Sequence, residues 1–201
     1  MGTLLNRRRY MGGGDSLPYD AEVQYLVTTK SSTLDTNINN TDIGYIRVVK
    51  QYASTPSGQQ GDGCYVSSPR FYGAIGYVKQ GLGMQFSGSG GDRKVLDFDT
   101  NEHTWIVDVI NAQGTVDSTT ITIPISSILP GTFIVNGYSP QRVSGTMYKS
   151  VELYNMSMVK ILDLIPIRKG QQGGWYDQVS GELMGVGVFT AGPDKIGGVN
   201  T

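Results

Sequence analysis

Hydrophobic and polar residues alternate along most of the chain from Tyr19 onward. The cleanest alternation lies in 119–125, where isoleucines occupy one face and threonines the other: Ile121, Ile123, Ile125, Thr120 and Thr122. A period of two is typical of a β-strand with one buried face and one face in water. The alternation therefore predicts a strand over 119–125.

The same period predicts strands elsewhere. Two runs have well-defined faces, 105–110 and 22–27. In the first run Trp105, Val107 and Val109 share one face, and Ile106, Asp108 and Ile110 share the other. In the second run Val23, Tyr25 and Val27 share one face. Shorter runs predict strands at 45–49, 71–78, 84–86, 94–98, 132–136, 147–154 and 158–167.

Turn residues separate these runs, and glycine is frequent, at 28 of 201 residues, about twice the usual share. No stretch of ten residues has the period of an amphipathic helix, although 126–129 could form a single helical turn. Many short strands with glycine-rich turns predict an all-β fold, a sandwich or jelly roll of two antiparallel sheets. We expect one domain over 18–201, preceded by an extended arm over 1–17.

Charge argues against two classes of partner. Lys and Arg total 16 and Asp and Glu total 17, so the net charge is −1. A chain this close to neutral has no overall attraction to nucleic acid or to an anionic membrane surface. No run approaches the roughly 18 apolar residues that cross a bilayer, and 1–17 lacks the apolar stretch of a secretory signal. We expect neither nucleic acid nor membrane as a partner.

The chain offers little material for catalysis. Cys64 and His103 are the only residues of their kinds, which excludes an intramolecular disulfide and a Cys/His zinc site. His103 begins a strong predicted strand, so we expect a hydrogen-bonded structural role for it. Cys64 has no histidine near it in the sequence, which favours a partly buried structural thiol over a nucleophile.

The acidic stretch 97–102 is the one candidate for glycoside hydrolysis, through Asp97, Asp99 and Glu102. Sandwich-fold glycosidases place two carboxylates about 5 Å apart on one strand face. Here a turn-forming Asp-Thr-Asn sequence separates Asp97 from Glu102, which favours a solvated acidic loop. Loop carboxylates also suit calcium, but the spacing of a calcium loop is missing. We expect a protein that is not an enzyme and has no cofactor, with calcium as the alternative.

Tyrosines near turns are the remaining candidates for ligand binding. Tyr72, Tyr77 and Tyr138 could line a groove in which their rings stack on a glycan. The alternative is that these rings pack across a half-buried sheet. The sequence leaves both interpretations open.

Residues 1–17 differ in composition from the rest of the chain. They combine apolar side chains with a run of arginines: Leu4, Leu5, Arg7, Arg8, Arg9, Tyr10 and Met11. Three glycines at 12–14 follow and make a flexible hinge. One interpretation is a disordered, solubilising tail. The other is an arm that orders on a partner, with its arginines on carboxylates or carbonyls and its apolar side chains in small pockets.

The C-terminal third carries a specific series of motifs. They are GTMYKSVELYN at 145–155, LDLIPIRKG at 162–170, GWYDQVSGELMG at 174–185 and FTAGPD at 189–194. This series resembles the concanavalin-A-like (laminin-G-like) jelly-roll domains of gut Bacteroidales and their phages. Earlier segments are similar too: AEVQYL at 21–26, LDTNI at 34–38 and HTW at 103–105.

The shared motifs are of a structural kind. Pro166 is expected to end a strand, and Asp177 with Ser180 and Gly181 to build a tight hairpin. The sequence departs from the family pattern at Asn37, where glycine is usual. Two further departures are Leu164 in place of phenylalanine and Gly185-Val186 in place of Gly-Asn.

The arm carries a resemblance of its own, because LLNRRRYM at 4–11 is similar to the short L-x-R-R-R-x-M openings of phage structural proteins. Together these resemblances imply a virion protein on the outer surface of a phage particle: a capsid decoration, a head fibre or a tail-associated fibre. The arm would dock on other virion proteins, and a lectin-like domain would face host or mucosal glycans. We also expect a homo-oligomer. The alternative is an extracellular carbohydrate-binding or adhesion module of a bacterial surface protein.

Overall fold

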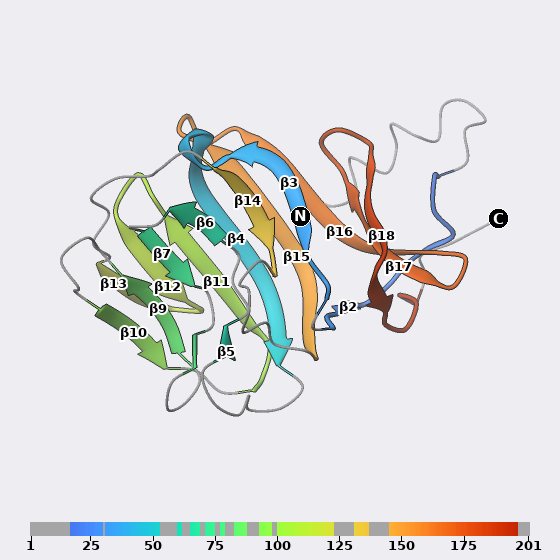
Figure 1. Cartoon of the computed structure of the whole chain (residues 1–201), viewed down its shortest axis with the longest axis horizontal. Coiled ribbons are helices and arrows are strands. Elements are labelled where there is room, and N and C mark those ends of the chain that lie inside the picture. Colours follow the sequence, from blue (N-terminus) through green and yellow to red (C-terminus); the bar gives the residue numbers. More distant parts are fainter. Residues whose placement is uncertain are drawn as a thin grey trace.

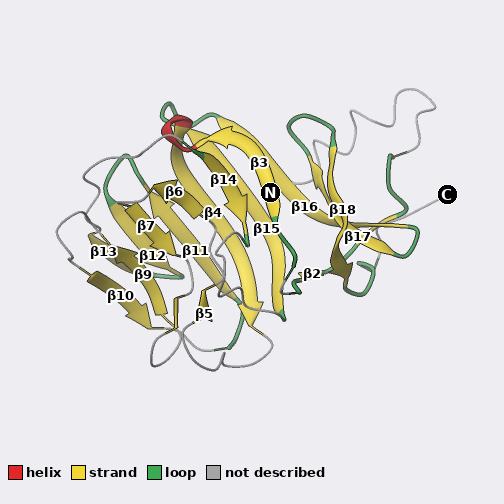
Figure 2. Cartoon of the chain, in the orientation of Figure 1, coloured by secondary structure: helices red, strands yellow, loops and turns green. Residues whose placement is uncertain are grey.

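The computed structural model describes residues 17–29, 31–52, 60–61, 65–68, 71–74, 77–78, 83–87, 93–97, 100–122, 131–136 and 145–196. For the residues between 60 and 97 in this list, it describes the backbone alone. These residues form an all-β structure of antiparallel sheets (Figure 1). Their one helical element is a short 3₁₀ turn, η1 (Asn40–Asp42), drawn in red in Figure 2. None of the described residues forms a helix that could cross a membrane. The predicted all-β fold is confirmed.

The strands form one large sheet, one smaller sheet and one isolated pair. The order in the ten-stranded sheet is β1 (Ala21–Glu22), β16 (Lys160–Lys169), β17 (Gln172–Asp177), β18 (Leu183–Ala191), β2 (Leu26–Val27), β15 (Thr146–Asn155), β4 (Ile43–Tyr52), β11 (His103–Asp108), β12 (Gln113–Val116) and β13 (Thr119–Thr122). The order in the six-stranded sheet is β10 (Arg93–Asp97), β9 (Gly83–Ser87), β7 (Phe71–Ala74), β6 (Tyr65–Ser68), β14 (Thr132–Val135) and β3 (Leu34–Asn39). β5 (Gln60–Gly61) pairs with β8 (Tyr77–Val78).

β15 divides one of its edges between two neighbours. Its C-terminal half pairs with β16, where Leu153 lies opposite Leu162, and its N-terminal half pairs with β2, where Tyr148 lies opposite Leu26. β16, β17, β18 and β2 also pair in succession. These five strands therefore form a closed ring of pairings, which curls away from the broad part of the large sheet at the right of Figure 1.

The inner face of the large sheet carries the core. Trp105, Val107 and Val109, which the alternation places on one face, are all buried. They pack in one cluster with Phe133 and Val135 of β14, so the six-stranded sheet covers this face. Burial of each large apolar side chain stabilises the fold by about 1.5–3 kcal/mol.

The prediction of a single strand over 22–27 is wrong. The chain forms two short strands there, and β1 pairs with β16 whereas β2 pairs with β15 and β18. Val23 and Leu26 are fully buried, while Val27, which the alternation places on the same face as Val23, is half-buried. Between the two strands the chain changes partners, and there the Gln24 N–H donates to the Pro193 carbonyl at 2.8 Å. One regular alternation cannot continue through such a change.

Pro166 does not end a strand, contrary to expectation, but lies inside β16 opposite Trp175. At this point β16 exchanges one neighbour for another, since Leu164 pairs with β15 and Ile167 pairs with β1. The Pro166 carbonyl accepts a hydrogen bond from the Val23 N–H at 3.0 Å. Proline has no N–H to donate at this position, where β16 exchanges its neighbours.

The other predicted strands exist with small changes. The segment 71–78 is divided, because β7 belongs to the six-stranded sheet and β8 pairs with β5. The predicted strand 45–49 is longer, as β4. β13 has Ile121 half-buried and Thr120 exposed, as expected, and the helical turn predicted at 126–129 lies outside the described residues. The remaining strands, β9, β10, β14, β15 and β16, end within two residues of their predicted limits.

Candidate functional site

Most of the residues that the sequence singled out for binding lie where the structure gives no side chain. All the arm residues that the sequence singled out lie outside the described residues: Leu4, Leu5, Arg7, Arg8, Arg9, Tyr10 and Met11. Tyr138 is outside them too. The backbone of Tyr72 lies in β7 and that of Tyr77 in β8, two strands of different sheets. Binding roles for these residues therefore remain predictions.

The acidic stretch 97–102 spans two sheets. Asp97 ends β10 in the six-stranded sheet, whereas Glu102 precedes β11 in the ten-stranded sheet and pairs with Lys149. Asp99 and Cys64 lie outside the described residues. Within the described part of the chain, no three His, Cys, Asp or Glu residues gather in a way that could hold a metal ion.

His103 makes the hydrogen bond that was expected of it. Its Nδ1 lies 2.7 Å from Asp117 Oδ2, and the Thr104 N–H donates to the other Asp117 oxygen at 2.9 Å. Asp117 adopts a left-handed conformation with φ of 53° in the turn between β12 and β13. The carboxylate therefore ties this turn to the start of β11, which is a structural role.

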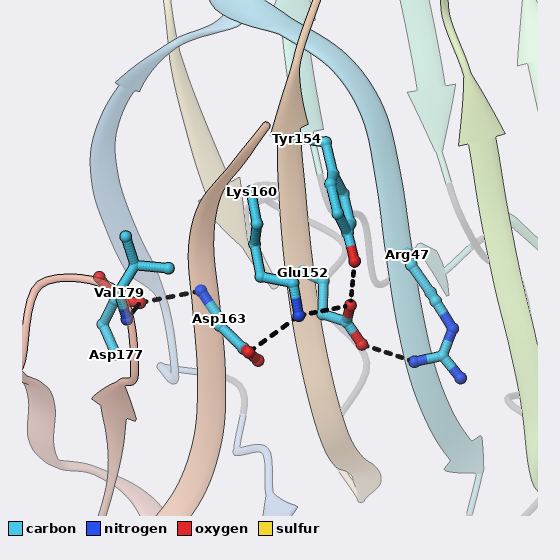
Figure 3. A network of polar contacts seen from close by, with 7 residues as sticks. All are labelled: Arg47, Glu152, Tyr154, Lys160, Asp163, Asp177 and Val179. Atoms are coloured by element: carbon cyan, nitrogen blue, oxygen red, sulfur yellow. Dashed lines mark hydrogen bonds and ion pairs between the residues drawn. The ribbon is translucent and has the colours of Figure 1, made fainter. Parts of the chain in front are cut away.

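Charged side chains gather instead on the outer face of the large sheet, which points away from the core. Arg47, Glu152 and Asp163 lie directly opposite one another on three adjacent strands, β4, β15 and β16. Lys160 and Tyr154 project from the same face beside them (Figure 3). We call these five residues the outer-face network.

Glu152 is the centre of this network. Its Oε1 accepts a hydrogen bond from Arg47 Nη1 at 2.6 Å, and its Oε2 accepts one from Tyr154 Oη at 2.7 Å. Lys160 Nζ lies 3.0 Å from the same Oε2 and donates to Asp163 Oδ2 at 2.9 Å. One ammonium group thus bridges two carboxylates (Figure 3).

A β-bulge places Lys160 in this network. In a regular strand, residues three apart point to opposite faces, so Lys160 and Asp163 would be separated by the sheet. The register shifts by one residue between the Leu153–Leu162 and Tyr154–Lys160 pairs, which leaves Ile161 as the extra residue. The bulge therefore brings Lys160 to the face that carries Asp163.

The two carboxyls have pKa values displaced in opposite directions. Burial acts to raise the pKa of Glu152, but hydrogen bonds from Tyr154 and Lys160 and the charges of Lys160 and Arg47 outweigh it, so this pKa is lowered. Burial raises the pKa of Asp163, which has Lys160 alone to oppose it. The pKa of Lys160 is raised, because hydrogen bonds to Asp163 and Glu152 outweigh the effect of its burial.

The network continues into the hairpin between β17 and β18 through backbone groups. The Asp177 carboxylate is buried and accepts hydrogen bonds from the Asp163 N–H at 2.8 Å and the Val179 N–H at 3.1 Å, through Oδ1 (Figure 3). Its Oδ2 accepts one from the Ser180 N–H at 3.1 Å. Gly181 closes the turn with φ of 80°. The tight hairpin predicted for Asp177, Ser180 and Gly181 is confirmed.

Two tyrosines lie next to the network. Tyr45 and Tyr154, directly opposite each other on β4 and β15, pack edge to face with ring centroids 5.5 Å apart. Burial raises the pKa of both phenols, and the hydrogen bond to Glu152 adds to this for Tyr154. Both phenols therefore stay protonated near neutral pH. Half-buried rings beside fixed charges form a surface on which a polar ligand with apolar patches could lie.

This arrangement suits binding better than proton transfer. A general acid or base needs a pKa near the working pH and a free position toward the substrate. Here Lys160 forms ion pairs with the carboxylates of both Glu152 and Asp163, and its pKa is raised, further from neutral pH. The network can therefore offer charges and hydrogen-bonding groups held in place, and its carboxylates do not form a free acid–base pair.

Sequence reasoning did not find this network. Its local signal is weak: Glu152 and Tyr154 two apart on a predicted strand, and Lys160 three residues before Asp163. Comparisons of the chain with protein-family models, with curated proteins and with solved structures found no match.

Proposed function

We propose that this chain is a non-enzymatic structural protein of a phage virion that displays a carbohydrate-binding domain. Residues 18–201 form a concanavalin-A-like jelly roll in this proposal, and residues 1–17 are the arm that anchors it to other virion proteins. The domain faces outward, as a capsid decoration or as part of a fibre, toward host or mucosal glycans.

The observation that carries the binding part of the proposal is the outer-face network. Arg47, Glu152, Lys160 and Asp163 hold one another within hydrogen-bond distance on three strands. Tyr45 and Tyr154 lie beside them. Side chains already ordered in the free protein lose little entropy when a ligand binds, so such a face favours recognition of a polar ligand.

Two of the shared motifs support the fold part of the proposal. Asp177 of the YDQVSG motif accepts three backbone hydrogen bonds and so has a structural role. Asn37 stands where the resembled family has glycine, and its φ is 57°. Glycine and asparagine are the residues that most readily adopt this left-handed conformation, so the departure preserves the backbone.

The anchor is tested by deleting residues 1–14 and measuring attachment of the protein to virions that lack it. We expect the full chain to cosediment with particles and the deletion variant to stay in solution. A matched control replaces Arg7, Arg8 and Arg9 by lysine, which keeps the charge but loses the planar donor geometry of arginine. Attachment of the deletion variant at the level of the full chain would show that the arm is not an anchor.

The carbohydrate part is tested separately on a glycan array with the full chain. We expect binding to some glycans, weakened at least tenfold in a Tyr45→Ala, Arg47→Ala double variant. An array on which no glycan is bound would overturn the carbohydrate-binding part of the proposal. It would not bear on the anchor, which the deletion experiment tests.

A further inference from the structure

A second polar surface lies at the end of the large sheet where η1 leads into β4. The chain forms an open depression of about 610 Å³ there, between the β3–η1 segment and the turn from β15 to β16. Figure 2 shows the 3₁₀ turn and this β15–β16 turn at the same end of the molecule. The outer-face network does not contribute to it. We call this surface the η1 depression.

The lining of the η1 depression has a distinctive composition. Its polar residues are Asn37, Asn39, Thr41, Asp42, Asn155 and Ser157. Its apolar residues are Ile38, Met156 and Ile161. Three carboxamides, two hydroxyls and one carboxylate thus surround aliphatic side chains. Among the residues that the structure describes, the lining contains neither a cation nor an aromatic ring.

Hydrogen bonds hold the β3 side of the depression in place. Asn37 has φ of 57°, and its N–H donates to Asp35 Oδ1 at 2.9 Å. The other Asp35 oxygen accepts a hydrogen bond from Thr132 Oγ1 at 2.8 Å. Asn39 Oδ1 accepts hydrogen bonds from both the N–H and the hydroxyl of Thr41, at 3.2 and 3.0 Å. The Asn37 and Asn39 side chains are therefore presented from a fixed backbone.

The opposite side is equally well ordered. Asn155 Oδ1 accepts hydrogen bonds from the Ser157 N–H at 2.9 Å and the Val159 N–H at 3.0 Å, within the turn between β15 and β16. The Asn155 N–H donates to the Val159 carbonyl at 2.9 Å, and the Met158 N–H donates to the Asn155 carbonyl at 2.9 Å. This turn keeps Met156 half-exposed, at 53%.

Several hydrogen-bonding groups in the depression remain open. Among the described residues, nothing bonds to the Asn37 side-chain amide or to the Asp42 carboxylate. Asn39 and Asn155 use only their oxygens within this part of the chain, so their amide nitrogens can still donate. The depression therefore offers amide donors and a carboxylate acceptor together.

We propose that the η1 depression binds a neutral saccharide unit. Sugar hydroxyls both donate and accept, so neighbouring hydroxyls can donate to the Asp42 carboxylate and accept from the amides of Asn37, Asn39 or Asn155. The C–H face of the sugar would lie on Ile38, Met156 and Ile161. The described lining residues include no cation, so they give a phosphate, sulfate or uronate no counter-charge. With no aromatic ring, a nucleobase has no stacking partner.

This inference rests on the carbohydrate-binding part of the proposed function and locates a subsite that is separate from the outer-face network. The test is a ¹H–¹⁵N NMR titration of the full chain with methyl glucoside, methyl galactoside, methyl mannoside and fucose. A small ligand on an open surface binds with a Kd on the order of 1 mM. We expect at least one of these sugars to shift resonances of residues 37–42 and 155–161, including the side-chain amides of Asn37, Asn39 and Asn155.

Two variants remove lining groups without disturbing the fold. Asn37→Gly deletes the amide at a left-handed position that glycine adopts without strain, and Asp42→Asn removes the charge at similar shape. Each is expected to weaken sugar binding about tenfold. The control Lys169→Gln, at an exposed position outside both polar surfaces, is expected to leave this titration unchanged.

The outcomes separate the two proposals. Shifts with none of the four sugars would overturn the inference, and so would shifts that both lining variants leave unchanged. Glycan-array binding that survives Asn37→Gly and Asp42→Asn leaves the proposed function standing without this subsite. A parallel titration with putrescine, a diamine cation, tests whether the depression binds a cation instead. Shifts with putrescine and with none of the sugars, lost in Asp42→Asn, would identify a cation site and overturn the saccharide assignment.

Discussion

Lys50 Nζ donates to Tyr52 Oη at 3.0 Å, and both side chains are buried in the core. The same nitrogen lies 5.0 Å from the ring centroids of Tyr52 and Trp105 and 5.6 Å from that of Tyr148. Ring faces attract a cation, and the attraction is stronger away from water. Three aromatic residues from three strands therefore enclose one lysine side chain beneath the large sheet.

This enclosure predicts that Lys50 resists acylation. In the folded chain an N-hydroxysuccinimide acetate reagent should modify the exposed Lys169 readily and leave Lys50 unmodified, since Lys50 is 0% exposed. Peptide mass spectrometry over a time course measures both sites in one sample. Repeating the reaction in denaturant should bring the two rates together. Equal rates in the folded protein would contradict the burial of Lys50.

The Asp177 carboxylate is expected to be essential for the stability of the β17–β18 hairpin. In Asp177→Ala three backbone N–H groups, those of Asp163, Val179 and Ser180, lose their acceptor. We expect the free energy of unfolding to fall by about 2–4 kcal/mol, measured by urea denaturation. Asp177→Asn keeps one acceptor oxygen, so its loss should be about half as large. An alanine variant as stable as the wild type would show that water replaces the carboxylate without cost.

The lowered pKa of Glu152 predicts a loss of stability in acid. Between the folded pKa and the ordinary value of 4.5 the unfolded chain binds more protons, so the free energy of unfolding falls as the pH drops through this window. Glu152→Gln should lack this dependence and cost about 1–2 kcal/mol at pH 7. Urea denaturation from pH 3 to pH 7 measures both effects.

Asp163 serves as a control, because its contribution to stability changes with pH in the opposite direction. Its pKa is raised above 3.8, so just above that pH the folded chain binds more protons and stability falls as the pH rises. Asp163→Asn removes this opposing contribution, and the stability of the variant should rise more steeply with pH than that of the wild type. Identical pH profiles for the wild type and both variants would contradict the opposed pKa shifts.

Gly44 is expected to tolerate no side chain. A Cβ at this position would lie 2.7 Å from the Asn155 carbonyl oxygen and 2.8 Å from Met156 Cα, both backbone atoms of the turn beside the η1 depression. Gly44→Ala should therefore lower the free energy of unfolding by about 1–3 kcal/mol. Gly170, which has φ of 60° and no atom within 4 Å of such a Cβ, provides a matched control as Gly170→Asn, since asparagine tolerates this conformation. An equal loss in the free energy of unfolding for the two variants would contradict steric crowding at Gly44.

Predictions from the sequence succeeded where the signal is local. Alternation alone places Trp105, Val107 and Val109 on one face, because the direction of a side chain in a strand depends only on its place in the period of two. The structure shows that this face is the buried one. The Asp177 hairpin follows from turn chemistry within five residues. Prediction failed at 22–27 and at Pro166, where the chain changes pairing partners. The partners lie far away in the sequence, so the local residue pattern does not indicate where the change occurs.

Alternation and turn residues predict the β-strands, the residues that share a face of the strand at 105–110 and the position of the C-terminal hairpin, because these features depend on side chains a few residues apart. The outer-face network and the η1 depression arise only in the folded chain, where segments far apart in the sequence come together. Arg47 and Glu152 are 105 residues apart and meet through the register of β4 with β15, and Lys160 joins them through a bulge. Register and bulges are set by the packing of whole strands against one another, which no short segment of sequence contains.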